Sequence, residues 1–328
     1  MYSDNVLDCI GNTPIVKIHC LSDSKRNINV LGKLEGFNPG ASIKDRTALQ
    51  MVLSAEDSGV LQQGGTIVEA TSGNLGIALA IICAVKKYKF ICVADPKMPQ
   101  NNIYAIEALG ASVVISKKKD SSGSYQRPRI ELARRLATEL PNAVNLDQYG
   151  NESAFQAHYQ ITGREIFSQL AGNLDVIVAN VSTGSHLSGI ARYLKEMDEN
   201  IKAVAVEPEG SVIFGGLSKP FLQNGTGLTF VPQNYRREYI DSEVKVSDKN
   251  AFNMIRRVAS SEGIILGGSS GAALYAASKF AENLKDNSTI LVMLPDFGFK
   301  YLNTLYNDNW ISENIEHEED VHAELIPS

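Results

Sequence analysis

The feature that most constrains the fold is a series of short β-branched runs separated by segments of helical composition. Continuous apolar strands that alternate with helices are typical of a parallel sheet covered on both faces. The sequence therefore predicts an α/β fold, and 328 residues are enough for two domains. The runs that we expect to form strands are Thr66–Glu69, Phe90–Ala94, Ser112–Ser116, Asp175–Ala179, Lys202–Val206 and Thr289–Leu294.

Charge and hydropathy exclude two classes of partner. The chain has 31 Lys and Arg against 37 Asp and Glu, a net charge of -6, which is the wrong sign for a protein that binds nucleic acid by bulk charge. Apolar runs such as Ile77–Val85 are far shorter than the ~20 residues needed to cross a bilayer. Residues Met1–Asp8 lack the basic-then-apolar order of a signal peptide. We therefore expect a cytosolic chain without nucleic-acid or membrane partners.

The cysteines and histidines predict neither disulfides nor a metal site. No CxxC spacing occurs, and no two histidines have ligand spacing on one helix. Buried, reduced thiols are the expectation. The chain has four cysteines, which are Cys9, Cys20, Cys83 and Cys92, and five histidines, among them His19, His158, His186 and His317.

Four polar, glycine-bearing segments fall at predicted loops: Asn38–Arg46, Thr71–Gly76, Ser182–Gly189 and Gly267–Gly271. The second follows a strand, and open α/β sheets bind ligands at the carboxyl ends of their strands. The third lies between a strand and a helix, where backbone N–H groups can surround a phosphate. It lacks the Walker and GxGxxG spacings, which disfavours a nucleotide triphosphatase or a dinucleotide dehydrogenase.

These segments, with GNTP at Gly11–Pro14 and LPDFGFKYL at Leu294–Leu302, resemble the fold-type II pyridoxal-phosphate (PLP) enzymes of the cysteine synthase and cystathionine β-synthase family. The resemblance covers about residues 5–310. It implies a tryptophan synthase β-like fold of two three-layer α/β/α domains with the cofactor in the cleft between them. It also implies a homodimer that acts on amino-acid substrates.

The implied domains are a larger, cofactor-binding domain of residues 1–42 plus 153–310 and a smaller, mobile domain of residues 43–152 that carries the substrate loop. Residues 311–328 are dominated by acidic side chains and are expected to form a tail.

The resemblance assigns the cofactor residue by residue. Lys44 matches the lysine that forms a Schiff base with the cofactor, and such a lysine must become a neutral amine, which burial favours. Asn74 matches the side chain that binds the cofactor's 3′ oxygen, a role compatible with capping the helix that follows. Ser269 matches the partner of the pyridine nitrogen; its neutral hydroxyl suits β-elimination better than transamination. Helix capping is the alternative for Ser269.

The phosphate of the cofactor is assigned to Ser182, Thr183, Gly184, Ser185 and His186, where the family usually has GTGGT. Serines replace two glycines, so the backbone is less permissive while the loop gains hydroxyls. His186 replaces a threonine, and both a phosphate contact and an ordinary loop histidine remain open for it.

Substrate binding is assigned to Thr71, Ser72, Asn74 and Gln148, whose hydroxyl and amide donors can hold a carboxylate. Arg127 and Arg129 precede the expected helix Ile130–Glu139, and either could supply positive charge to an anionic substrate or be a solvated arginine. We select Arg129. Tyr149 stands where cysteine synthases commonly have phenylalanine, and we include it.

Several departures from ordinary cysteine synthases are similar to the subgroup that makes N-(2-amino-2-carboxyethyl)-L-glutamate from O-phospho-L-serine and L-glutamate. They are EPEGSVIFGG at Glu207–Gly216, QNGTGL at Gln223–Leu228, TSGNLG and Tyr149. This predicts a β-replacement transferase that supplies 2,3-diaminopropionate for siderophores or antibiotics. The alternatives are a cysteine synthase that uses O-acetyl- or O-phospho-L-serine with sulfide, and an inactive binding or regulatory subunit.

Overall fold

The computed structural model describes residues 2–121, 123–315 and 325–326, and the chain divides into two compact units. Unit 1 comprises Met1–Gly11 and Asn38–Ala157, and unit 2 comprises Asn12–Phe37 and His158–Ser328. The sequence analysis expected residues 1–11 in the larger domain, whereas the structure groups them with unit 1. Leu7 packs against the core of unit 1, and the Gly11 N–H donates to Asn38 Oδ1 at 2.8 Å.

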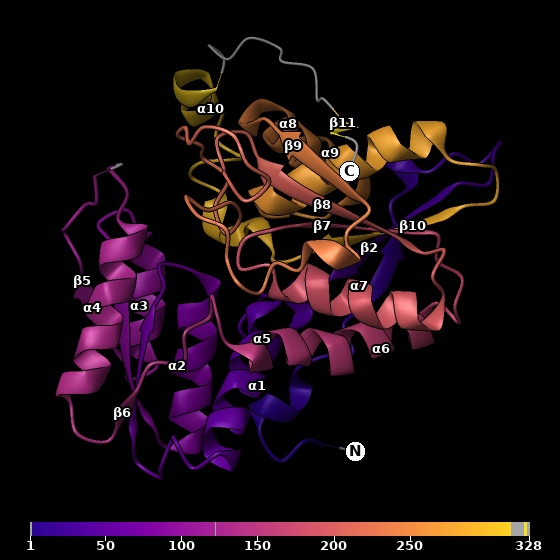
Figure 1. Ribbon diagram of the computed structural model, residues 1–328. Coiled ribbons are helices and arrows are strands. Elements are labelled where there is room, and N and C mark those ends of the chain that lie inside the picture. Colours follow the sequence, from indigo (N-terminus) through magenta and orange to yellow (C-terminus); the bar gives the residue numbers. More distant parts are fainter. Residues whose placement is uncertain (1, 122, 316–324, 327–328) are drawn as a thin grey trace. The chain divides into compact units, whose positions relative to one another are not determined.

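Unit 1 is built on a four-stranded parallel sheet in the order β5-β4-β3-β6 (Figure 1). Helices α1, α2 and α3 contribute to an apolar cluster on one face, and α4 packs on the other. This is the sandwich that strands apolar on both faces require. The elements are α1 (Lys44–Asp57), β3 (Thr66–Ala70), α2 (Asn74–Lys86), β4 (Lys89–Ala94), α3 (Gln100–Ala108), β5 (Ser112–Ile115), α4 (Gln126–Glu139), β6 (Ala143–Val144) and α5 (Glu152–Gln156).

Unit 2 is built on a seven-stranded sheet in the order β1-β2-β10-β7-β8-β9-β11. The two edge strands, β1 and β11, run antiparallel to their neighbours, and the other pairs are parallel. Helices α8 and α9 pack over the main apolar cluster of this sheet. The elements are β1 (Ile15–Lys17), β2 (Asn29–Leu34), α6 (Gly163–Gln169), β7 (Val176–Asn180), α7 (Ser185–Met197), β8 (Lys202–Pro208), β9 (Ser242–Val246), α8 (Asp248–Glu262), α9 (Gly268–Asn283), β10 (Thr289–Leu294), α10 (Asp308–Asn314) and β11 (Leu325–Ile326).

The six predicted strands are confirmed as β3, β4, β5, β7, β8 and β10, each within two residues at either end. The sequence analysis did not predict β2 or β9, although each lies inside the larger sheet between two neighbouring strands. The helix that contains Arg129 begins at Gln126, so the predicted loop before Ile130 is wrong. Pro128 is compatible with this start because it stands in the first turn, where its missing N–H removes no helical hydrogen bond.

A buried ion pair joins β2 to α6 in unit 2. Lys33 is 0% exposed, and its Nζ contacts Glu165 Oε1 and donates to Thr13 O and Gln169 Oε1, both at 2.7 Å. Glu165 also accepts the N–H groups of Asn12 and Thr13 at 3.0 and 3.1 Å. Glu165 therefore helps to fasten Asn12 and Thr13 to the core of unit 2.

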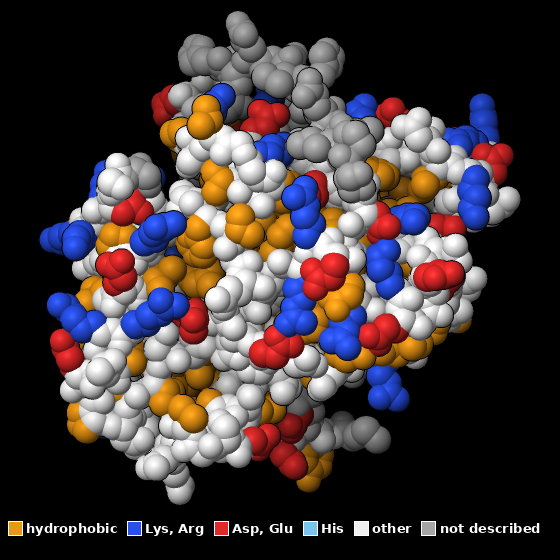
Figure 2. Space-filling view, in the orientation of Figure 1, with side chains coloured by type: hydrophobic (Ala, Val, Ile, Leu, Met, Phe, Trp, Pro, Cys, Tyr) orange, Lys and Arg blue, Asp and Glu red, His pale blue; other side chains and the backbone are white. Residues whose placement is uncertain are grey.

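The predicted acidic tail lies largely outside the described residues, which omit 316–324 and 327–328. Packing continues past residue 311, where the tail was expected to begin, because Ile315 is buried against the core of unit 2. In α10 the Trp310 ring lies 6.2 Å from that of Phe252. Acidic and basic side chains are interspersed over the face shown in Figure 2. None of the described helices is long and apolar enough to span a bilayer.

Candidate functional site

Lys44 is the first residue of α1 in unit 1. The chain reaches it through a tight segment in which Ala41 has a φ of +58°, and the Lys44 N–H donates to Ser42 Oγ at 3.3 Å. Burial lowers the pKa of the Lys44 amine to about 8. The position reinforces this, because the N-terminal end of a helix is electropositive and disfavours an ammonium group. Lys44 is therefore suited to act as a neutral amine.

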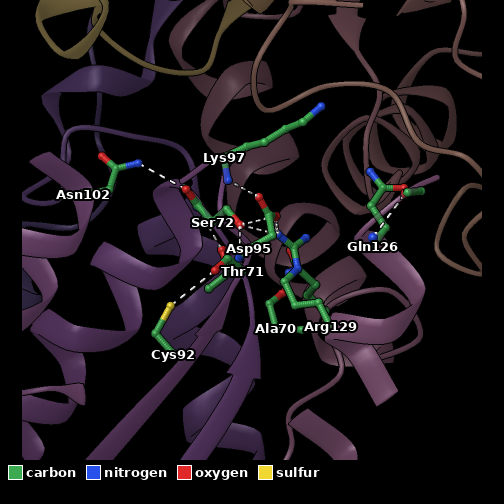
Figure 3. Close-up of polar contacts among 12 residues, drawn as sticks. Ala70, Thr71, Ser72, Cys92, Asp95, Lys97, Asn102, Gln126 and Arg129 are labelled. Atoms are coloured by element: carbon green, nitrogen blue, oxygen red, sulfur yellow. Dashed lines mark hydrogen bonds and ion pairs between the residues drawn. The ribbon is translucent and has the colours of Figure 1, made fainter. Parts of the chain in front are cut away.

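The segment from Thr71 to Asn74 connects β3 to α2 at the carboxyl end of β3, and we call it the substrate loop (Figure 3). Its backbone is fixed from two neighbouring elements. Asn102 Nδ2 donates to Ser72 O at 3.2 Å, and the Cys92 thiol lies 3.3 Å from Thr71 O. Asn74 is the first residue of α2 and Gly73 is the N-cap, so the suggestion that Asn74 caps this helix is wrong.

The Ser72 side chain contacts an ion pair that the sequence analysis did not predict. Its hydroxyl donates to Asp95 Oδ2 at 2.7 Å, and Arg129 Nη1 donates both to Ser72 Oγ and to Asp95 Oδ2 (Figure 3). Asp95 directly follows β4, the strand beside β3. A polar residue at the carboxyl end of the neighbouring strand was the signal that could have identified Asp95.

The two candidate arginines differ in their surroundings. Arg127 is exposed, whereas Arg129 is 7% exposed and its guanidinium lies 2.5 Å from Asp95. A hydrogen bond also joins Arg129 to the phenol of Tyr149, whose pKa is raised chiefly by burial. Arg129 Nε is buried and has no hydrogen-bond partner. Of the residues predicted to bind substrate, the structure thus brings together Ser72, Arg129 and Tyr149.

Gln148 lies beside the end of β3 in unit 1. Its Nε2 donates to Ala70 O at 2.8 Å, immediately before the substrate loop. The segment that carries it is held by Glu69, whose carboxylate accepts the Asp147 N–H at 2.9 Å and the Asn145 amide at 3.1 Å. Burial raises the pKa of Glu69 to about 7. Glu69 therefore positions Gln148, a role that the sequence analysis missed.

The predicted phosphate loop in unit 2 ends at the start of α7, which begins at Ser185. Gly184 has a φ of +83°, and a Cβ at this residue would lie 2.5 Å from the Tyr235 backbone, so only glycine fits without strain. Ser182 and Ser185 do not have positive φ, which explains why serine is accepted where the family usually has glycine. The hydroxyls of Thr183 and Ser185 lie 3.3 Å apart.

His186 is the second residue of α7 and is 5% exposed, so it is not a loop histidine. Its ring packs edge-on against that of His158, with centroids 6.0 Å apart. His158 belongs to a π-helical turn, Ala157–Thr162, and its Nδ1 lies 3.0 Å from Thr162 Oγ1. No motif in the sequence indicated that these two histidines are partners.

Ser269 stands in the first turn of α9, which begins at Gly268. The expected cap of a helix after Gly271 is therefore wrong, because the helix starts earlier and Gly267 is its N-cap. Ser269 is 4% exposed, and the neighbouring Ser270 hydroxyl is buried without a hydrogen-bond partner. Among the described residues, no group of His, Cys, Asp and Glu has the arrangement of a metal site.

Residues 6–296 match the family described as "Pyridoxal-phosphate dependent enzyme". Cystathionine beta-synthase of Dictyostelium discoideum is 38% identical over 318 residues, which are 95% of this chain and 63% of that protein. The chain thus spans less than two thirds of the length of the cystathionine beta-synthases of D. discoideum and Apis mellifera.

A second relative is matched over nearly its whole length. The N-(2-amino-2-carboxyethyl)-L-glutamate synthase of Ralstonia nicotianae is 38% identical over 312 residues, which are 95% of this chain and 92% of that protein. Among solved structures, the O-acetylserine dependent cystathionine beta-synthase of Helicobacter pylori superposes with a TM-score of 0.86 at 33% identity, covering 93% of this chain and 98% of that one.

Proposed function

Because the chain belongs to the pyridoxal-phosphate dependent enzymes, we propose that it joins O-phospho-L-serine and L-glutamate to give N-(2-amino-2-carboxyethyl)-L-glutamate and phosphate. The observation that carries this proposal is the match over nearly the whole length of the relative named for that product. The side chains of Arg129 and Tyr149 beside the substrate loop support it as hydrogen-bond donors, because binding an anionic donor substrate requires several such groups.

The residues of each unit fit pyridoxal phosphate. In unit 1, Lys44 has the lowered pKa that a Schiff-base lysine needs. In unit 2, Gly184 opens the N-terminus of α7, where backbone N–H groups and the Thr183 and Ser185 hydroxyls can receive a phosphate. The unpartnered Ser270 hydroxyl shows that the start of α9 has unused hydrogen-bonding capacity beside Ser269.

We propose the following roles for the residues that the motifs identified. Lys44 would hold the cofactor covalently, Asn74 would bind its 3′ oxygen, and Ser269 would face its ring nitrogen. Ser182, Thr183, Gly184, Ser185 and His186 would hold its phosphate. The bound cofactor supplies an electron sink for the substrate Cα, and a hydroxyl partner such as Ser269 keeps that sink weaker than a carboxylate would.

Lys44 would also move the proton during β-replacement. Its Nζ would take the proton from the substrate Cα, and the bond between Cβ and the phosphate oxygen would break. The glutamate amine would then form the new C–N bond at Cβ and lose a proton, after which Nζ would return a proton to Cα. Thr71, Asn74, Gln148, Tyr149 and Arg129 would bind and orient the substrates, and Ser72 would orient the loop that carries Thr71 and Asn74.

A product assay tests the substrate pair. The cofactor-loaded protein is incubated with O-phospho- or O-acetyl-L-serine, each with glutamate, sulfide or homocysteine, and the products are identified by mass spectrometry. We expect the glutamate adduct, with one phosphate released per adduct, from O-phospho-L-serine and glutamate. Rapid formation of cysteine or cystathionine without a glutamate adduct would contradict the proposal.

The lowered pKa of Lys44 gives a pH prediction for the cofactor-free protein. An amine reacts with an aldehyde only when it is neutral, so the rate of modification should rise with pH through about 8. The exposed Lys89 of the same unit is the internal control for the general dependence of the reaction on pH. Reductive methylation followed by peptide mass spectrometry measures both. Equal profiles for the two lysines would contradict the prediction.

We further propose that the protein acts in the cytosol as a homodimer and that its product is a precursor of 2,3-diaminopropionate for a siderophore or an antibiotic. Light scattering coupled to gel filtration would give the mass of the assembly. A mass equal to that of one 35.7-kDa chain would contradict the dimer.

A further inference from the structure

The Ser72 hydroxyl is fully engaged within unit 1. A serine hydroxyl has one hydrogen, and this hydrogen points to Asp95 Oδ2 at 2.7 Å. The oxygen accepts from Arg129 Nη1. In this arrangement the Ser72 side chain cannot also donate to a substrate carboxylate, although the sequence analysis assigned Ser72 to that role.

Asp95 is itself held rigidly. It is 8% exposed, and its second oxygen, Oδ1, accepts the Lys97 N–H at 3.0 Å. Arg129, which comes from α4, contacts Oδ2 at 2.5 Å. The carboxylate and the guanidinium are both largely buried, and each neutralises the other. The substrate loop is thereby tied to a cluster whose net charge is zero.

We propose that Asp95 is a positioning residue that anchors the substrate loop through Ser72. Its carboxylate receives the Ser72 hydroxyl and orients Arg129, so that both side chains hold the loop in shape. Ser72 then serves the reaction as the point of attachment of the loop, and not as a donor to the substrate. This inference rests on the proposed function only in taking the segment Thr71–Asn74 as the place where the amino acid binds.

A double-mutant cycle tests the anchor. Ser72→Ala removes the interaction, whereas Asp95→Asn weakens it and also disturbs the ion pair with Arg129. We therefore expect kcat/KM to fall about tenfold in Ser72→Ala and at least as far in Asp95→Asn, mainly by raising KM. The double variant should lose no more than Asp95→Asn alone, and not the product of the two single losses that independent effects would give. The kinetics are measured with whichever donor and nucleophile give product, so the test does not depend on the proposed substrate pair.

Hydrogen exchange provides a readout without substrate. The amides of residues 72–76 should exchange faster in both single variants than in the wild type, because the loop has lost its hydrogen bond to Asp95. In the double variant they should exchange no faster than in the single variants. Asp57→Asn is the matched control: it removes one carboxylate from an exposed position of the same unit and should leave both measurements unchanged. The Ser72→Ala variant keeps the ion pair, so it tests the anchor even if Asp95→Asn folds poorly.

Three results would overturn the inference. Multiplicative losses in the cycle would mean that Ser72 and Asp95 act independently, with the hydroxyl contacting substrate. A lower KM in Asp95→Asn would mean that the aspartate is a placeholder that the substrate displaces. Unchanged exchange of the loop amides in Ser72→Ala would mean that the hydroxyl does not hold the loop.

Discussion

The Lys44→Ala variant is expected to lower kcat/KM by roughly 10⁴-fold, because it removes both the covalent attachment of the cofactor and the group that moves the Cα proton. The purified variant should also lack the absorbance band of the lysine-bound cofactor. Product formation over time and the visible spectrum measure the two effects separately.

The matched control is Lys89→Ala, which removes an exposed lysine from the same unit and should leave both the rate and the spectrum unchanged. Equal turnover in the wild type and in the Lys44→Ala variant would leave Lys44 without a catalytic role. If the wild-type protein itself gave no turnover with any donor and nucleophile, a binding or regulatory subunit would become the better description.

The Glu165→Gln variant is expected to lower the free energy of unfolding by about 3–5 kcal/mol. The substitution leaves the Lys33 ammonium fully buried and replaces the carboxylate beside it with an uncharged amide, while the oxygens of Thr13 and Gln169 remain as hydrogen-bond acceptors. It also weakens the acceptor of two backbone N–H groups in the GNTP segment. Chemical denaturation followed by circular dichroism measures the change.

An exposed ion pair in the same unit provides the comparison. Lys279 and Glu282 lie 3.1 Å apart but are 50% and 61% exposed, so Glu282→Gln should change stability by less than about 1 kcal/mol. Both substitutions remove one carboxylate charge, so the difference between their losses of unfolding free energy measures the effect of burial. A similar, small loss in both variants would show that the Lys33 pair contributes no more than a surface pair.

The sequence predicted the family, the α/β class and the strands that are apolar on both faces. A continuous apolar run identifies such a strand because both of its faces are buried. This criterion failed for β2 (Asn29–Leu34), where Gly32 and Lys33 interrupt the apolar pattern. Lys33 is paired there with Glu165, which is far away in the sequence, and a local pattern cannot reveal such a partner.

The candidate site was likewise predicted only in part. The motifs identified the substrate loop and the phosphate loop because their glycines and hydroxyls are contiguous in the sequence. They did not identify Asp95 or Glu69, whose roles depend on which strands become neighbours. The side chain of Arg129 was selected for its charge alone, and only the fold supplied its partners.

One parallel pair of the larger sheet joins strands from near the two ends of the sequence. β2 pairs in parallel with β10 over Asn29 to Leu34 and Thr289 to Leu294, so the chain must return across most of its length before this pairing can form. Contacts of such wide sequence separation slow folding, and chains emerge from the ribosome with the N-terminal part first. During synthesis, the early strand must therefore wait without its partner while residues 38–157 have already emerged and can collapse around their own core.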